Sequence, residues 1–140
     1  MRVNIMATMS KFVVIEHKAK RAGLHWDLRF RMPKSKLWAS FACRKQIPLT
    51  TGPKILASRT HDHTEKEALF TGKIESGYGA GTLKKWDSGS CKIERFSPSH
   101  IVVDFKGSKL KGIYHFISTK TIYKGEGTKG GYLLFKGKIS

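Results

Sequence analysis

The segment Leu24-His25-Trp26-Asp27-Leu28-Arg29 alternates apolar and polar side chains, residue by residue. This period of two is typical of a β-strand with one face against a core, because successive side chains of a strand point to opposite sides. The alternation places His25, Asp27 and Arg29 on one face, and His17 follows an apolar run a few residues upstream. Imidazole, carboxylate and guanidinium groups side by side suit a metal ion and a bound anion, and they do not suit a core.

Similar short strand patterns recur along the whole chain, whereas helical periodicity is weak. The segments with strand character are residues 12–15, 24–31, 37–42, 55–60, 68–74, 81–86, 91–96, 100–105, 112–118 and 132–136. Turn-forming residues separate them, as in Asp87-Ser88-Gly89, and residues 63–69 are expected to contain one short helical turn. The regular spacing predicts a mostly β fold, either an antiparallel sandwich or a closed barrel.

The chain of 140 residues has the length of one domain with a proper core. We expect residues 1–11 to form an N-terminal tail and residues 12–140 to fold as a single, monomeric domain. Residues 1–10 contain no continuous apolar run, so we expect no secretion signal. Cys43 and Cys91 lack Cys-x-x-Cys spacing and are typical of reduced thiols in an intracellular protein of the cytoplasm or nucleoid, although a disulfide between them remains open.

Charge is the extreme property of this sequence. Lys and Arg total 27 against 10 acidic residues, a formal net charge of +17. A globular protein of that kind usually binds a polyanion, and nucleic acid is the leading candidate. A membrane surface is the alternative, but the chain has neither a basic amphipathic helix nor an apolar run of the roughly 18 residues that span a bilayer.

His17, His25 and Asp27 form the first candidate site. Imidazole nitrogen and carboxylate oxygen together suit Mn²⁺, Fe²⁺ or Zn²⁺, and three ligands leave coordination positions open. The alternative is an ordinary surface hydrogen bond within the His-x-Asp pair.

Arg59 and the segment His61-Asp62-His63 form the second candidate site. Strand alternation predicts that Arg59, His61 and His63 share one face and that Asp62 points away as a structural partner. A histidine beside a bound phosphate can orient an oxygen or protonate a leaving group, because its ordinary pKa is close to neutrality. The alternative is a solvated basic edge.

The glycine-rich segment Glu75-Ser76-Gly77-Tyr78-Gly79-Ala80-Gly81-Thr82 permits a tight turn and a close backbone approach to a ligand or another strand. It lacks the features of a Walker loop or a Rossmann fingerprint. A structural motif built on Glu75, Gly77, Tyr78, Gly79 and Gly81 is therefore expected. Nucleophilic catalysis has no support, since neither cysteine has a neighbouring histidine and no Gly-x-Ser-x-Gly elbow exists.

Taken in order, these segments resemble the 3'-phosphoesterase domain of bacterial DNA ligase D and its stand-alone archaeal and bacterial relatives. The matching motifs are Phe-Val-Val-Ile-Glu-His at 12–17, Leu-His-Trp-Asp-Leu-Arg at 24–29, Ser-Phe-Ala-Cys-Arg-Lys at 40–45, Asp62-His63, the stretch 70–82 with Trp86-Asp87-x-Gly89, Lys-Leu-Lys-Gly-Ile-Tyr-His-Phe at 109–116 and Tyr-Leu-Leu-Phe-Lys at 132–136. The resemblance covers residues 12 to 136, nearly the whole chain.

The resemblance implies a compact closed antiparallel β-barrel with a basic surface groove. It also implies a metal-dependent activity that removes a 3'-phosphate, or a 3'-terminal ribonucleotide, from a DNA primer end in DNA repair. Manganese would be the preferred ion, with zinc, cobalt or another divalent transition metal as alternatives. His17, His25 and Asp27 would be the metal ligands, and Arg29 and His63 the phosphate-binding and catalytic residues.

Further basic side chains, Lys45, Lys54, Arg59 and His61, are predicted to line the groove and bind phosphate. The expected partners are DNA or RNA–DNA 3' ends, held through the phosphate backbone, with a ligase or polymerase acting in trans and no membrane.

Ile55 stands where the family carries an arginine, His61 where an acid is usual, and Glu67 where a tyrosine usually closes the site. These positions keep a second hypothesis open, a nucleic-acid-binding module on the same fold without turnover. A third hypothesis is an inhibitory protein whose partner is an acidic protein.

Overall fold

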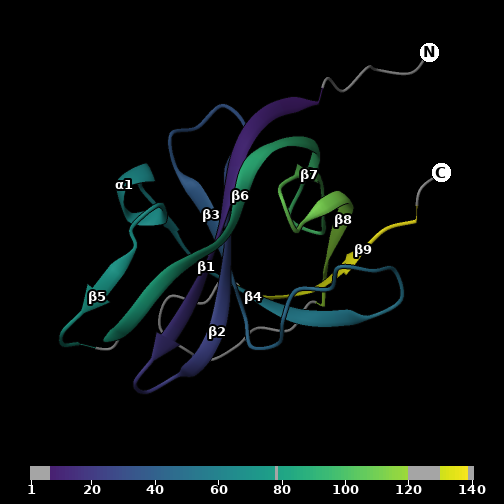
Figure 1. The fold of residues 1–140 in the computed structure, drawn as a ribbon. Helices are drawn as coiled ribbons and strands as arrows, with labels where there is room; N and C mark the ends of the chain where they lie inside the picture. The colour runs from purple at the N-terminus through teal and green to yellow at the C-terminus, as the bar shows by residue number, and fades with distance from the viewer. Residues whose placement is uncertain (1–6, 78, 120–129, 139–140) are drawn as a thin grey trace, which may run out of the picture.

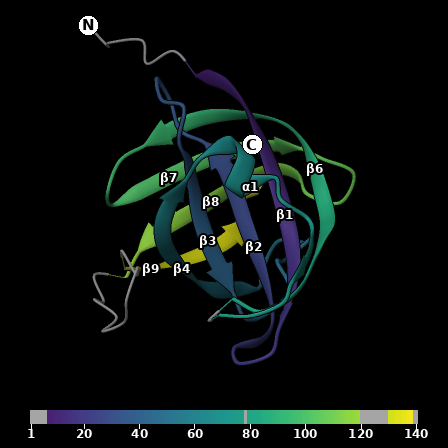
Figure 2. The same cartoon turned by 90° about the vertical axis from the view of Figure 1, so that its left-hand side faces the viewer.

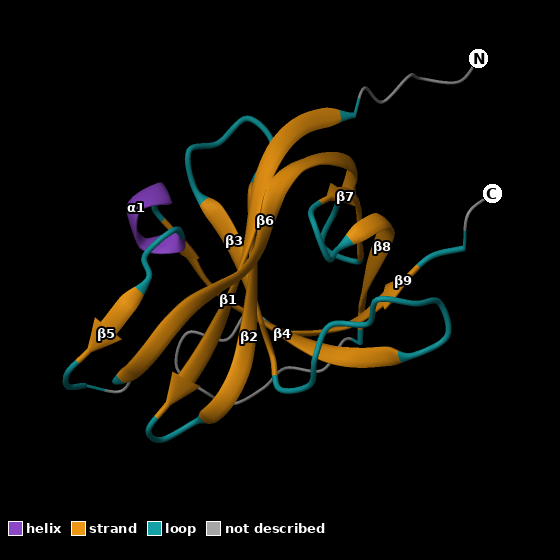
Figure 3. Ribbon diagram, viewed as in Figure 1, coloured by secondary structure: helices purple, strands orange, loops and turns teal. Residues whose placement is uncertain are grey.

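The computed structural model describes residues 7–77, 79–119 and 130–138, which form strands and one short helix (Figures 1 and 3). The elements are β1 (Thr8–Ala19), β2 (Gly23–Arg31), β3 (Trp38–Cys43), β4 (Lys54–His63), α1 (Glu65–Ala68), β5 (Gly72–Ile74), β6 (Gly81–Phe96), β7 (His100–Lys106), β8 (Lys111–Ser118) and β9 (Gly131–Lys136). Within these residues, no helix is long and apolar enough to cross a bilayer.

The strands close into a barrel. Their order is β1-β2-β3-β4-β9-β8-β7-β6, and β6 pairs back onto β1, so the last strand meets the first. Every one of these pairings is antiparallel. β5 lies outside this ring, paired with the first residues of β6. The prediction of a closed antiparallel barrel is confirmed, and the sandwich alternative is wrong.

Two apolar clusters pack against β1, one on each of its faces. Phe12 and Val14 point into the barrel, where they join the large core cluster. Val13 and Ile15 point outward and pack against Trp38 and Leu83 and against Ala68 of α1. This two-sided burial explains why residues 12–15 form a continuous apolar run instead of an alternating one. The outer cluster fixes α1 over the barrel wall, and Figure 2 shows α1 lying in front of the strands.

Strand β6 corrects one prediction. Sequence patterns split it into residues 81–86 and 91–96 with a turn at Asp87-Ser88-Gly89, but it is a single strand of 16 residues. A bulge that leaves Trp86 unpaired bends it against β1 between Val14 and Ile15. The chain makes no turn at Asp87. Its carboxylate accepts hydrogen bonds from the backbone N–H groups of Ser88 and of the β7–β8 turn, and so ties β6 to that turn.

Helix α1 confirms the predicted helical turn within residues 63–69. Thr64 caps its N-terminus and Glu67 completes a capping box with the Thr64 backbone. The predicted strand at residues 68–74 is wrong in its first part, since Ala68 ends the helix and the strand β5 comprises three residues. The last carbonyl groups of α1, those of Glu67 and Ala68, accept hydrogen bonds from Arg29 on the outer face of β2.

Candidate functional site

The candidate site lies on the outer wall of the barrel, over strands β1 to β4. Across β1 and β2, His17 is opposite His25 and Ile15 is opposite Asp27, while across β2 and β3 Arg29 is opposite Ser40. Residues directly opposite each other in a sheet share a face. The prediction that His25, Asp27 and Arg29 lie on one face is confirmed, since all of them line one cavity.

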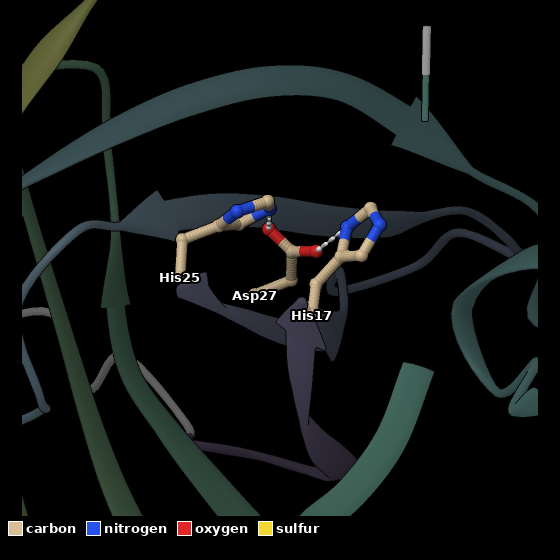
Figure 4. A group of neighbouring side chains, drawn as sticks. All are labelled: His17, His25 and Asp27. Carbon is tan, nitrogen blue, oxygen red and sulfur yellow. Dashed lines mark ion pairs between the residues drawn. The ribbon is translucent and has the colours of Figure 1, made fainter. Parts of the chain in front are cut away.

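His17, His25 and Asp27 converge as Figure 4 shows, with the two imidazole rings on either side of the carboxylate. Nδ1 of His17 lies 3.7 Å from Oδ2 of Asp27, and Nε2 of His25 lies 3.4 Å from Oδ1. One ligand atom from each residue falls within 4.8 Å of the others. His17 and Asp27 are buried, so the carboxylate meets few competing waters. We call these three residues the histidine–aspartate triad.

Backbone carbonyl groups set the orientation of both rings. Nε2 of His17 lies 3.0 Å from the carbonyl oxygen of Gly79, and Nδ1 of His25 lies 3.3 Å from that of Gly23. A carbonyl only accepts, so in the neutral ring each of these nitrogens carries the proton. The lone pairs then lie on the two nitrogens that face Asp27. Such outer hydrogen bonds are those that orient metal-ligating histidines in proteins, so the donor set fits a divalent ion.

The charge state of Asp27 also suits a cation. Burial raises the pKa of this carboxyl. The hydrogen bonds that the two imidazoles donate when their Asp27-facing nitrogens carry a proton, together with the charge of Arg29, outweigh burial and hold the pKa well below its usual range. Burial opposes protonation of His25, yet its hydrogen bond with Asp27 and the charge of that carboxylate raise its pKa. A permanently ionised carboxylate thus sits between two imidazoles, which is a ligand arrangement for a transition-metal ion.

Arg29 forms an ion pair with Asp27 and holds its carboxylate in place. Its Nη2 lies 3.4 Å from Oδ2 of Asp27, and its Nε donates to Ser40 Oγ at 3.1 Å. Nη1 donates to the carbonyl oxygens of Glu67 and Ala68 at the end of α1. Four of its five N–H groups are thereby directed at acceptors among the described residues. A single N–H of the guanidinium is left to donate to a ligand in this arrangement.

A cavity of about 870 Å³ extends from the triad across β3 and β4. We call it the groove. Its small floor residues are Ser40, Ala42, Ser58 and Thr60, and its cationic or imidazole side chains are Arg29, Arg44, Lys45, Lys54, His61 and His63. The predicted positions of Lys45, Lys54, His61 and His63 are therefore brought together with the triad. The lining combines ligands for a metal ion with cations for phosphate oxygens.

Arg59 lies elsewhere, against the prediction. Between Ser40 and Trp38 of β3, the partner strand β4 advances from Thr60 to His63, so β4 carries one extra residue. This bulge changes the side of the sheet to which the following side chains point. Arg59 packs its guanidinium near the Phe41 and Phe96 rings and pairs with Asp62 at 3.3 Å. The structural role predicted for Asp62 is thus confirmed.

His61 and His63 stand at the far end of the groove from Lys54, with ring centroids 4.3 Å apart. Burial, together with the nearby charges of Arg29 and His61, lowers the pKa of His63 to about 4. His63 is therefore neutral at pH 7 and can donate one hydrogen bond and accept another. A bound phosphate dianion would offset the surrounding positive charge and raise this pKa.

The depressed pKa of His63 predicts an acid-dependent loss of stability. A histidine with a pKa of about 4 when folded and about 6.5 when unfolded binds protons more readily in the unfolded chain. The free energy of unfolding should therefore fall by roughly 2 kcal/mol as the pH drops from about 6.5 to 4. Urea unfolding across this range measures the slope, and the His63→Gln variant should show a flatter one. Equal slopes in the two proteins would contradict the depressed pKa.

The glycine-rich segment packs against the triad. Gly81 has a φ of +147°, and a Cβ there would collide with the carbonyl oxygen of Lys18, so the close approach predicted for this segment is made to β1. Gly77 also has a positive φ, and the exposed Glu75 pairs with Lys73. Tyr78 lies outside the described residues. The segment places the Gly79 carbonyl on His17, a role that no sequence signal indicated.

Ile55 and Arg44 are two further positions at the groove. Ile55, which stands where the family carries an arginine, packs in the barrel core, and its neighbour Lys54 provides a cation to the groove. Arg44 is a groove residue that was not predicted from the sequence. The alternation of Ser40, Ala42 and Arg44 indicates the groove face for all three. Arg44 donates to the Ala22 carbonyl and lines the groove.

Comparison with known proteins assigns a family to this geometry. The sequence profile described as DNA ligase D 3'-phosphoesterase domain matches residues 15–118. The chain is 40% identical over 122 residues to the multifunctional non-homologous end joining protein LigD of Mycolicibacterium smegmatis, covering 79% of this chain and 16% of that protein. It is 37% identical over 113 residues to the proteins called LigD in Mycobacterium bovis and Mycobacterium tuberculosis, covering 77% of this chain and 14% of each relative. The chain thus spans less than a fifth of the length of these curated relatives.

Proposed function

The chain belongs to the DNA ligase D 3'-phosphoesterase domain family, and from this premise we propose that it is a metal-dependent phosphoesterase that processes 3' ends of DNA during repair. Family membership supports the phosphoesterase class and the end-processing role. The finer proposal is that the protein removes a terminal 3'-phosphate, or a 3'-terminal ribonucleotide, with Mn²⁺ as the preferred ion. The observation that carries it is the convergence of the histidine–aspartate triad at the end of a cationic groove.

A divalent ion held by Nδ1 of His17, Nε2 of His25 and the Asp27 carboxylate would supply Lewis-acid polarisation of a phosphoryl oxygen. Arg29 keeps the carboxylate oriented and ties it to α1, and its one free N–H can donate to a phosphate oxygen. His63, neutral before substrate binds, can donate a hydrogen bond to the phosphate or to the leaving 3'-oxygen. Lys45 and Lys54 hold backbone phosphates without selecting a base sequence.

The relatives are named as multifunctional end-joining proteins, and this chain matches only a small part of them. We propose that it prepares ends that a ligase or polymerase acting in trans then seals or extends. A 3'-hydroxyl is the chemical requirement of both reactions, and removal of a 3'-phosphate produces it.

Incubation of a 3'-phosphorylated DNA primer–template with the protein tests this function. We expect release of inorganic phosphate with Mn²⁺, none with EDTA, and none from a 5'-phosphorylated control. The His25→Ala variant should lose at least about 99% of the rate, because it removes one ligand and leaves Asp27 without its nearer imidazole. Circular dichroism would show that the variant remains folded. A metal-independent rate that survives His25→Ala would contradict the proposal.

The second candidate is a binding module without turnover. It is favoured by Glu67, whose carboxylate lies 3.8 Å from Nδ1 of His63 and so stands near the groove where the family carries a tyrosine. Such a module would bind the same oligonucleotide with an affinity that falls steeply with salt. It would yield no metal-dependent product in the phosphate-release assay, which separates the two candidates.

A further inference from the structure

Two further imidazoles meet on the outer face of β7 and β8. Ile101 of β7 and Phe116 of β8 are buried in the barrel core, so their neighbours His100 and His115 point outward. Val102 is opposite His115, which makes His100 its diagonal neighbour across the two strands. Nε2 of His100 lies 2.9 Å from Nδ1 of His115, and the ring centroids are 5.1 Å apart. We call these two residues the histidine pair.

The histidine pair is separate from the site described above. The strand order places β7 and β8 across the barrel from β2, which carries two residues of the triad (Figure 1). Neither histidine of the pair belongs to the groove lining, and the proposed phosphoesterase reaction uses neither of them. Both rings are partly exposed, so a dissolved ion can reach them.

The surroundings hold the ring of His115 in place. It stacks on Phe135 of β9 with centroids 5.3 Å apart and an interplanar angle of 18°. A Cβ at Gly137 would lie 2.9 Å from Nε2 of His115, so the chain after β9 passes close to the far side of the ring. Nδ1 of His115 is therefore directed to His100 by packing as well as by the hydrogen bond between them.

The separation of the two facing nitrogens suits a shared metal ion. Two imidazole nitrogens bound to one Zn²⁺ at about 2.0–2.1 Å, with an angle of about 90–110° between the bonds, lie about 2.9–3.4 Å apart. The observed 2.9 Å is at the edge of that range. A small rotation of each ring about its Cβ–Cγ bond turns the two lone pairs from each other to a common point on the solvent side.

The protons of the pair can be rearranged without net release. In the hydrogen bond, one facing nitrogen carries a proton and the other accepts it. Nδ1 of His100 and Nε2 of His115 have no hydrogen-bond partner within the described part of the chain, so either can carry the ring proton instead. Burial and the charges of His115 and Arg95 lower the pKa of His100, which keeps this ring neutral at pH 7. Two neutral imidazoles with facing lone pairs are then available as ligands.

We propose that the histidine pair binds one divalent transition-metal ion that prefers nitrogen ligands, Zn²⁺ or Cu²⁺, and that it discriminates against Mn²⁺. The pair contains no carboxylate, and Mn²⁺ is the weakest binder of the first-row series and favours oxygen ligands. The triad does contain a carboxylate. The two sites therefore differ in the ions they select, and the ion on the histidine pair links β7 to β8 on the side of the barrel away from the groove.

Calorimetric titration of the whole protein with Zn²⁺ tests this inference through the variants His100→Gln and His115→Gln. Each should bind about one equivalent of Zn²⁺ fewer than the wild type, because a single remaining imidazole does not hold the ion. Titration with Mn²⁺ should give the same count in all three proteins. Asp104→Asn, at an outward carboxylate of β7 paired with Lys106, is the matched control and should leave the Zn²⁺ count unchanged. Circular dichroism checks that the variants are folded.

Long-range proton–nitrogen NMR spectra of the imidazole rings give a direct readout. Zn²⁺ should shift Nε2 of His100 and Nδ1 of His115 in the wild type and in His25→Ala, where the triad is incomplete. The same Zn²⁺ count in the wild type and both pair variants would overturn the inference, and so would an equal loss in Asp104→Asn. These outcomes are independent of turnover. Absence of Mn²⁺-dependent phosphate release, with the Zn²⁺ site intact, would refute the phosphoesterase proposal alone.

Discussion

Replacing Asp27 with asparagine should weaken Mn²⁺ binding by at least about 100-fold and reduce phosphate release by about a thousandfold. The amide keeps the shape of the side chain but removes the negative charge between the two imidazoles. Loss of an outer partner of a metal ligand already costs 10- to 100-fold, so loss of a ligand should cost more. Titration calorimetry with Mn²⁺ and the phosphate-release assay measure the two effects.

The same substitution should destabilise the fold by about 3 kcal/mol, because it leaves the buried guanidinium of Arg29 without its counter-charge. The dependence of the free energy of unfolding on pH provides a second check. The pKa of Asp27 lies below its usual range, so its contribution to stability is complete above about pH 4 and is lost as the pH falls further. The variant should lack that loss. Asp104→Asn, at a carboxylate paired with Lys106, is the control and should leave metal affinity unchanged. Wild-type Mn²⁺ affinity in Asp27→Asn would refute the metal centre.

Replacing Asp87 with alanine should destabilise the protein by about 3–5 kcal/mol. The buried carboxylate accepts four backbone N–H groups, from Ser88, Ser108, Lys109 and Leu110, at distances between 2.8 and 3.0 Å. A buried donor without a partner costs about 1–3 kcal/mol, and water can reach some of the four in the variant. Denaturant unfolding at pH 7 measures the difference.

The control for Asp87 is Asp104→Ala, which removes a partly exposed ion pair and should change stability by less than about 1 kcal/mol. Burial raises the pKa of Asp87, but the backbone hydrogen bonds outweigh it and lower the pKa overall. The stabilisation should therefore persist at neutral pH and fade on acidification. A loss below 1 kcal/mol in Asp87→Ala would mean that the β7–β8 turn holds its shape without this carboxylate.

The barrel and the triad face were predictable because both follow from local alternation. Leu24–Arg29 needs no distant information to place its polar residues together, and antiparallel pairing with β1 brings His17 opposite His25. Alternation fails at bulges, since an extra residue is not visible in the sequence. That is why alternation wrongly groups Arg59 with His61 and His63. The division of β6 has a different cause, the turn-forming residues at 87–89.

Long-range partners were the other part that the sequence could not provide. The sequence presents Asp87 as a turn former, because the backbone N–H groups that donate to its carboxylate lie more than 20 residues away. Arg29 reads as a free phosphate ligand until its bonds to Ser40 and to α1 are known. The Gly79 carbonyl contacts His17 through the backbone, so no side chain in the sequence indicates this contact. These features depend on tertiary contacts, which composition and spacing do not encode.

The register of β1 with β2 has a consequence for the proposed metal centre. The triad residues come from two adjacent strands of a closed barrel, so their separation is set by the sheet and not by the cation. Many small domains whose ligands come from otherwise unfolded segments fold only when the metal binds. Here the proposed coordinating atoms are already assembled, so we expect the metal-free protein to fold intact and to bind the ion afterwards. Replacement of one ion by another would then be a reversible exchange that follows the cellular supply of metals.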